Sequence, residues 1–260
     1  MSIDGSVTSA EDVARLVDGC DVVVHLAGLS DPARCAAEPD LCLEVNRGGT
    51  ERVCAASHAA GVGHVIVAST VHVYGLADGP LDEAAPCRPA SVYAASKAAA
   101  EEAAREWSAR GLRVTVVRLA NVYATDSPAI TFVGQVLADL RDGRAVRYRG
   151  GGHRRDFVHV DDVVDAIGRL ITAGPPSPPF ELLNVGTGEG HTTAEVAEML
   201  CAMAREDGLT VEAPRSLQPS AAGDALVPAI AALRARLQWQ PAISLREGVR
   251  RVWRQTPVAR

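Results

Sequence analysis

Short apolar runs alternate with helical patterns along the first half of the chain. Three runs carry few charges and are typical of strands buried on both faces of a parallel sheet: Asp21–Ala27, His64–Ser69 and Arg113–Leu119. Helical periodicity is found before and between them, at Asp12–Val17, Thr50–Ala60 and Val92–Ala109. This alternation predicts βαβ units, and therefore an α/β fold with a doubly wound, parallel, Rossmann-like sheet.

The pattern loosens after Val122. We expect one more short strand, Leu182–Val185, and helices at Phe132–Leu140, Val160–Ile171 and Thr193–Arg205, with two amphipathic helices within Ala229–Arg254. The Pro-rich stretch Gly174–Pro179 is typical of a connector. We therefore predict that residues 1–124 and 156–190 form a Rossmann-like core, and that residues 125–155 and 191–260 form a small substrate-binding lobe.

Composition narrows the class of protein. The chain is 47% hydrophobic and 22% charged, as in an ordinary globular protein, and its net charge of −6 without a basic patch argues against nucleic-acid binding. No apolar run approaches 18 residues and the N-terminus lacks an apolar leader, so neither a membrane span nor a signal peptide is expected. The six cysteines form no CxxC pair and the seven histidines have no metal spacing, which favours a reduced, cytoplasmic protein without a metal site.

One basic residue differs in kind from the rest. Lys97 is the single lysine among 26 basic residues, and it follows Tyr93 by four positions in a predicted helix. Residues with this spacing share a helix face. An ammonium beside a phenol would lower its pKa from a reference value near 10 and create a general acid/base usable near neutral pH. A compact ammonium can also hydrogen-bond a ribose, for which the planar fork of arginine is less suited.

Polar and small residues gather where the predicted strands end. His25-Leu26-Ala27-Gly28 ends the first strand, a run from Ala68 to Gly75 with hydroxyls at Ser69 and Thr70 ends the second, and Asn121 follows the third. Asn46-Arg47-Gly48-Gly49-Thr50 is expected to open a helix. In open α/β sheets, ligands bind at the carboxyl ends of the strands. These segments therefore predict one binding crevice.

The order of these segments resembles the extended short-chain dehydrogenase/reductases, in the NAD-dependent epimerase/dehydratase branch. The motifs HxAG, NxxGT, STxxVYG, YxxxK, RxxNVY, RRDFVHVDD and NVGTG occur in this order, and the resemblance runs from about Gly5 to Trp253. It implies that Tyr93 is the catalytic acid/base, that Lys97 lowers its pKa and holds the nicotinamide ribose, and that Thr70 polarises the reacting oxygen.

The resemblance also implies two sets of binding residues. The cofactor, NAD or NADP, would be bound or supported by Ala27, Asn46, Ser69, Lys97 and Asn121. The substrate, a sugar or nucleotide sugar, would be bound by His72, Asn121 and Arg155.

Simpler roles remain open for several of these residues. Asn46 could be only a helix N-cap, Thr70 could only cap a strand end, and Arg154 and Arg155 could be surface charges. His25 is expected to be a packed core residue.

The sequence departs from the family pattern at its start. It contains no GxxGxxG turn and begins at what matches the end of the family's third strand, so about 60 residues of βαβ structure are missing. The first strand, Asp21–Ala27, would then be a sheet edge, apolar on both faces, and such an edge favours pairing with another chain. We expect either a homodimer across this edge or a covering segment, and the missing cofactor half would come from sequence upstream of Met1 or from a partner chain.

Two further departures concern chemistry. Relatives that are 4,6-dehydratases carry Thr-Asp-Glu where this chain has Thr70-Val71-His72, so dehydration is not expected. The stretch Ser220–Asp224 lacks the second phosphate-binding arginine that the family often has before Gly-Asp.

Three functions remain open. The first is an NAD(P)-dependent epimerase or ketoreductase that uses Tyr93 on a hydroxyl or ketone of a sugar-like substrate. The second is a cofactor-independent isomerase, lyase or cyclase that reuses Thr70, Tyr93 and Lys97. The third is a non-catalytic partner subunit, against which the intact Thr-Tyr-Lys set counts.

Overall fold

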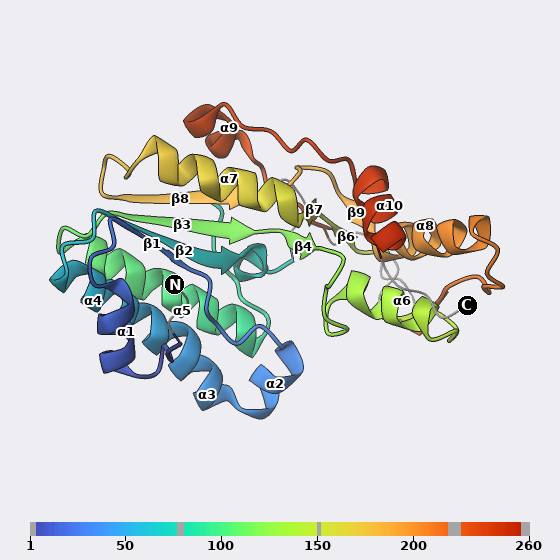
Figure 1. Cartoon of the computed structure of the whole chain (residues 1–260), viewed down its shortest axis with the longest axis horizontal. Helices are drawn as coiled ribbons and strands as arrows, with labels where there is room; N and C mark the ends of the chain where they lie inside the picture. Colours follow the sequence, from blue (N-terminus) through green and yellow to red (C-terminus); the bar gives the residue numbers. More distant parts are fainter. Residues whose placement is uncertain (1–3, 77–80, 150–151, 218–224, 256–260) are drawn as a thin grey trace.

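The computed structural model describes residues 4–76, 81–149, 152–217 and 225–255. At its centre is a parallel sheet in the order β1-β2-β3-β8, formed by Val22–His25, His64–Thr70, Val114–Leu119 and Phe180–Val185. Helices lie against both faces of this sheet (Figure 1). The predicted Rossmann-like α/β class is confirmed.

The two faces of the sheet bury different sets of aliphatic side chains. Val65, Val67, Val114 and Val116 belong to one core cluster, whereas Ile66, Val117, Leu183 and Val185 belong to another. α1 (Ala10–Val17), α4 (Gly49–Ala59) and α5 (Val92–Ser108) cover the first face, and α7 (Val160–Ala173) and α9 (Ala231–Leu237) cover the second (Figure 1). Because both faces are covered, the strands are the continuous apolar runs that the sequence displays.

Two short helices precede α4. Asp31 caps α2 (Pro32–Ala37) by accepting a hydrogen bond from Ala33 N at 2.9 Å, and α3 (Pro39–Leu43) also starts at a proline. α3 continues through a π-helical turn, Glu44–Gly48, directly into α4. Asn46 therefore lies inside a helical segment, and the alternative role of Asn46 as an N-cap is wrong.

A second group of helices packs beyond the carboxyl ends of the strands (Figure 1). α6 (Phe132–Arg141), α8 (Thr193–Glu206) and α10 (Leu245–Gln255) share a core cluster that includes Val136, Leu200, Val249 and Trp253. Short strands link this group to the sheet: β4 (Asn121–Tyr123), β5 (Arg147–Tyr148), β6 (Arg154–Arg155), β7 (Phe157–His159), β9 (His191–Thr192), β10 (Arg215–Ser216) and β11 (Ala225–Leu226).

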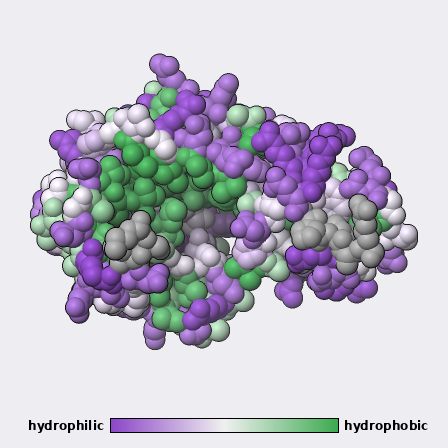
Figure 2. Space-filling view, viewed as in Figure 1, coloured by the Kyte–Doolittle hydropathy of each residue, from purple (hydrophilic) through white to green (hydrophobic). Residues whose placement is uncertain are grey.

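β1 is an edge strand of the sheet formed by the described residues, as predicted. Val22 and Val24 are only partly buried, and Leu26, on the loop after β1, is 62% exposed. The space-filling view shows apolar residues gathered on the face where β1 lies (Figure 2). This edge therefore combines unpaired main-chain groups with exposed apolar surface.

Candidate active site

A cavity of about 550 Å³ opens at the carboxyl ends of β2 and β3. Five of the predicted site residues line it: Ser69, Thr70, His72, Tyr93 and Asn121. The opposite wall comes from α6 and the turn before it, with Thr131, Phe132 and Val133. The sheet and the second group of helices thus share one cavity, as expected for an open α/β sheet.

Tyr93 lies in the first turn of α5. Ser91 caps this helix by accepting a hydrogen bond from Ala94 N at 3.1 Å, and Lys97 follows one turn after Tyr93. Burial raises the pKa of Tyr93, while a hydrogen bond with Thr70 lowers it. Burial of the phenol is the largest cause of this raised pKa, and the lowering of the Tyr93 pKa by Lys97 stays a prediction.

The Lys97 ammonium faces the loop after β1. Its side chain is buried, and burial lowers its pKa to about 8. The Nζ atom lies 3.9 Å from the position that a Cβ would take on Gly28, and a Cβ there would also lie 2.9 Å from Asn46 Oδ1. Because Gly28 has no side chain, the loop after β1, which includes Ala27, can lie close to Asn46 and beside the Lys97 ammonium.

Asn46 connects the loop after β1 to α5 through hydrogen bonds. Its Nδ2 atom donates to Ser96 Oγ at 2.8 Å, and Ser96 donates to the Tyr93 carbonyl at 2.8 Å. His25 is a packed core residue, as expected: it is 5% exposed and lies 3.1 Å from Thr50 Oγ1. Because the Thr50 hydroxyl donates to the Asn46 carbonyl at 2.7 Å, His25 Nε2 is the donor to Thr50.

A buried ion pair lies next to the acid/base residues. Glu101, four residues after Lys97 on α5, accepts hydrogen bonds from Arg118 Nε at 3.0 Å and from Arg118 Nη2 at 2.6 Å. Glu101 also accepts a hydrogen bond from the Ser69 hydroxyl. The prediction named Ser69 as a cofactor residue and did not include Glu101 or Arg118. The spacing YxxxKxxxE could have indicated Glu101, since both intervals are one helical turn.

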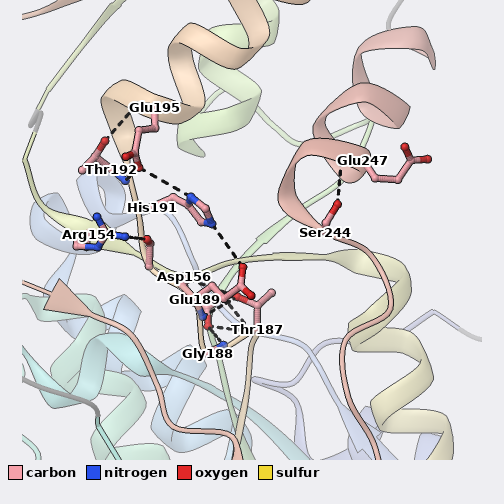
Figure 3. Close-up of polar contacts among 11 residues, drawn as sticks. Arg154, Asp156, Thr187, Gly188, Glu189, His191, Thr192, Glu195, Ser244 and Glu247 are labelled. Carbon is pink, nitrogen blue, oxygen red and sulfur yellow. Dashed lines mark hydrogen bonds and ion pairs between the residues drawn. The ribbon is translucent and has the colours of Figure 1, made fainter.

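Asp156 organises a second polar cluster (Figure 3). Its buried carboxylate accepts hydrogen bonds from Thr187 N at 2.8 Å, Thr187 Oγ1 at 2.8 Å and Gly188 N at 2.7 Å. Its carbonyl accepts bonds from Asn121 N at 3.0 Å and Asn121 Nδ2 at 2.9 Å. The RRDFVHVDD and NVGTG motifs thus meet at Asp156, which holds Asn121 at the cavity wall. Sequence spacing alone gave no sign of this contact.

His72 and Arg155, the two residues predicted with Asn121 to bind substrate, lie near one another. His72 lines the cavity. Desolvation of its ring and then the charge of Arg155 lower the pKa of His72, while a hydrogen bond with Asn121 raises it. Arg155 is partly buried and donates to the Arg154 carbonyl at 3.0 Å, and Arg154 donates to the Gly190 carbonyl (Figure 3). The Ser220–Asp224 stretch lies outside the described residues, so the predicted loss of the second phosphate-binding arginine stays a prediction.

The sequence matches the model of a known family. The profile of the NAD dependent epimerase/dehydratase family matches residues 2–186. The chain belongs to this family. It is 33% identical over 180 residues to a dTDP-glucose 4,6-dehydratase of Mycolicibacterium smegmatis, a match that covers 66% of this chain and 54% of the relative. The chain thus spans about half the length of this curated relative.

Other members of the epimerase/dehydratase family match over more of the chain. A UDP-glucose 4-epimerase of Mycolicibacterium smegmatis is 34% identical over 240 residues, which cover 88% of this chain and 74% of the relative. The solved structure of MoeE5 in complex with UDP-glucuronic acid and NAD superimposes with a TM-score of 0.85 at 29% identity, covering 98% of this chain and 84% of MoeE5.

The described residues were also searched for a metal site and for a membrane-spanning helix. Within them, no group of three histidine, cysteine, aspartate or glutamate side chains is arranged to hold a metal ion. No helix in the described ranges has the length and apolar character needed to cross a bilayer.

Proposed function

We propose that this chain carries the acid/base site of an NAD(P)-dependent epimerase or ketoreductase that acts on a hydroxyl or ketone of a nucleotide sugar. The observation that carries the proposal is that Thr70 and Tyr93 line the same cavity at the carboxyl ends of the strands, with Lys97 one helical turn from Tyr93. The phenolate form of Tyr93 would accept the proton of a substrate hydroxyl in the oxidising direction, and the phenol would return it in the reducing direction. Thr70 would hold the same oxygen by a hydrogen bond.

The residues beside Lys97 fit the nicotinamide half of NAD(P). Gly28 leaves room next to the ammonium, and no hydrogen bond from Lys97 to another described residue competes for it. Lys97 would hold a ribose hydroxyl there, Asn46 would fix the loop after β1 beside it, and Ala27 and Ser69 would contact the cofactor. When bound, the cofactor supplies the hydride acceptor and donor.

The cavity wall favours oxidation and epimerisation over dehydration. Within the described residues that line it, no aspartate or glutamate is present, and His72 stands where 4,6-dehydratases carry an acid. Loss of water from a sugar requires an acid and a base at the carbons that lose hydroxyl and proton. We therefore propose epimerase or ketoreductase chemistry, with His72, Asn121 and Arg155 as substrate-binding residues.

The division into a core and a substrate-binding lobe stays a prediction, supported by the separate core cluster of α6, α8 and α10. The homodimer also stays a prediction. A second copy that pairs along β1 would satisfy the open edge, and replacement of Val24 by lysine would then weaken the dimer in sedimentation-velocity runs. A monomeric wild-type protein at micromolar concentration would contradict the dimer.

The proposed function is tested with UDP-glucose and dTDP-glucose as trial substrates in the presence of NAD or NADP. Conversion is followed by nicotinamide absorbance and by chromatography of the sugar nucleotides. Tyr93→Phe is expected to lose about 100-fold or more in turnover. Tyr148 is a buried tyrosine of the core cluster that α6, α8 and α10 share, so Tyr148→Phe is the matched control and should retain wild-type turnover. Full activity of Tyr93→Phe would overturn the proposal.

One alternative is a cofactor-independent acid/base enzyme that reuses Thr70, Tyr93 and Lys97. Titration of the 260-residue protein with NADH, followed by nicotinamide fluorescence, separates the two functions. The pyrophosphate contacts supply much of the affinity, so without a partner chain we expect binding no tighter than about 1 mM. Turnover without any nicotinamide would support the cofactor-independent enzyme.

A further inference from the structure

The two elements that carry the acid/base residues, α5 and β2, meet β3 at one buried carboxylate. Glu101 on α5 is 7% exposed and accepts hydrogen bonds from Ser69 at the end of β2 and from Arg118 at the end of β3. Ser69 and Arg118 are register partners, and the next pair along the two strands is Thr70 and Leu119. Glu101 thus joins the helix of Tyr93 and Lys97 to the strand end of Thr70.

The charges in this region do not cancel. Arg118 and Lys97 are two buried cations, 3% and 7% exposed, and Glu101 is the buried anion near both. A guanidinium does not lose its proton in a protein, whereas a buried lysine does so readily. If Glu101 were uncharged, the remaining repulsion would therefore be relieved at Lys97.

Arg118 is fixed in place by other contacts. Its guanidinium carbon lies 4.5 Å from the centre of the Tyr74 ring, and Nη2 donates to Cys87 Sγ at 3.1 Å. Tyr74 in turn donates to Asn184 at 2.7 Å. These contacts hold the Arg118 charge beside α5 whatever the state of Glu101.

We propose that Glu101 is a positioning residue for the acid/base pair: its carboxylate neutralises Arg118 and holds the Ser69–Thr70 strand end, so that Lys97 can remain charged inside the site. The inference rests on the proposed function in one respect, that Tyr93 and Lys97 form the acid/base pair. Glu101 itself is not among the residues that line the cavity.

Other titratable groups also face Lys97. His25 comes from β1, Cys42 from α3 and Tyr93 from its own helix, with Cys35 of α2 next to Cys42. His25 has its pKa lowered to about 4, and burial raises the pKa of Cys35 to about 12. Both are therefore neutral around pH 8, where Lys97 titrates. Burial is the largest cause of the lowered Lys97 pKa, and the charges of Glu101 and then of Cys42 raise it.

The single lysine makes the test direct. Protein grown with lysine labelled at the ε carbon gives one ¹³C signal, because Lys97 is the only lysine. Its shift, recorded against pH on the full chain without substrate or cofactor, reports the charge on Lys97. Glu101→Gln should lower the pKa of Lys97 by about one unit or more, and Arg118→Met should raise it. Glu102→Gln, an exposed neighbour with the same charge change, should leave the curve unchanged.

Opposite shifts in the two variants would support the proposal, since a loss of packing alone would not move Lys97 in opposite directions. Unchanged curves in folded Glu101→Gln and Arg118→Met would overturn it. If Glu101→Gln does not fold, the double variant Glu101→Gln/Arg118→Met replaces it. The pKa of Lys97 should then be lower in the double variant than in Arg118→Met. Equal Lys97 pKa values in these two variants would overturn the proposal. Because no turnover is measured, failure of the proposed function leaves this result intact.

Discussion

The Asn46 side chain forms hydrogen bonds with both main-chain polar groups of Leu29. Its Oδ1 atom accepts a hydrogen bond from Leu29 N at 2.7 Å, and its Nδ2 atom donates to the Leu29 carbonyl at 3.0 Å. With its bond to Ser96, this side chain connects the loop after β1 to the first turn of α5. The position of this loop beside Lys97 therefore depends on the Asn46 amide, which both donates and accepts hydrogen bonds.

Replacement of Asn46 by aspartate should be strongly destabilising. The carboxylate cannot donate to Leu29 or Ser96 and would repel the Leu29 carbonyl, so we expect a loss of about 3 kcal/mol in the free energy of unfolding, measured with urea. Asp40→Asn, an exposed charge change on the adjacent α3, is the control and should cost little. Equal stability of the two variants would contradict the role of Asn46.

Lys97 should lower the stability of the folded protein at neutral pH. Its pKa is about 8 when folded and 10.5 in the reference state, so the unfolded chain binds more protons between these values and stability rises as pH increases from 8 to 10.5. The difference corresponds to about 3 kcal/mol. Lys97→Met should be more stable than wild type by up to this amount at pH 7, and the gap should close near pH 10.5. A gap that does not depend on pH would refute the assignment.

Two buried histidines should make the protein sensitive to acid. Burial lowers the pKa of His25 and of His64 from 6.5 to about 4. The neutral rings contribute stability above pH 6.5, and this contribution is lost as pH falls toward 4, because the unfolded chain gains protons first. His64→Gln should flatten part of the decline in urea-unfolding free energy between pH 6.5 and 4, whereas His58→Gln, an exposed change on α4, should not.

Two helical glycines should respond to alanine with opposite signs. A Cβ at Gly248 of α10 would lie 1.9 Å from the Tyr123 hydroxyl oxygen, while a Cβ at Gly168 of α7 meets no atom within 4 Å. Gly248→Ala should cost about 1 to 3 kcal/mol through overpacking, and Gly168→Ala should gain up to about 1 kcal/mol from helix propensity. Thermal unfolding of both variants tests this, and Tyr123→Phe should partly rescue Gly248→Ala.

The strands and long helices were predictable because each carries a local signal. The apolar run His64–Ser69 became β2 over His64–Thr70, and the Ala-rich pattern Val92–Ala109 became α5 over Val92–Ser108. The first run, Asp21–Ala27, shortened to Val22–His25, because a parallel strand ends where its pairing with β2 ends. α2 and α3 were not predicted, since each is a single turn or little more that tertiary contacts stabilise.

The candidate site was predictable only where its members are close in sequence or lie in a motif. Tyr93 and Lys97 follow from helical spacing, and Thr70, His72 and Asn121 from strand ends. Asn46 was named for its motif, but its N-cap alternative failed because helical structure begins before it, at Pro39. The contacts of Glu101 with Ser69 and of Asp156 with Thr187 join segments 32 and 31 residues apart, and no local pattern encodes such pairs.

The Asp156 cluster has a consequence for hydrogen exchange. Thr187 and Gly188 lie in a turn, and Gly188 is exposed, so rapid exchange of their amide hydrogens with solvent would normally be expected. Both amides instead donate to a carboxylate that is fully buried. Their exchange should therefore be slow, on the timescale of opening of the strands that Asp156 joins, and it should become fast in Asp156→Asn.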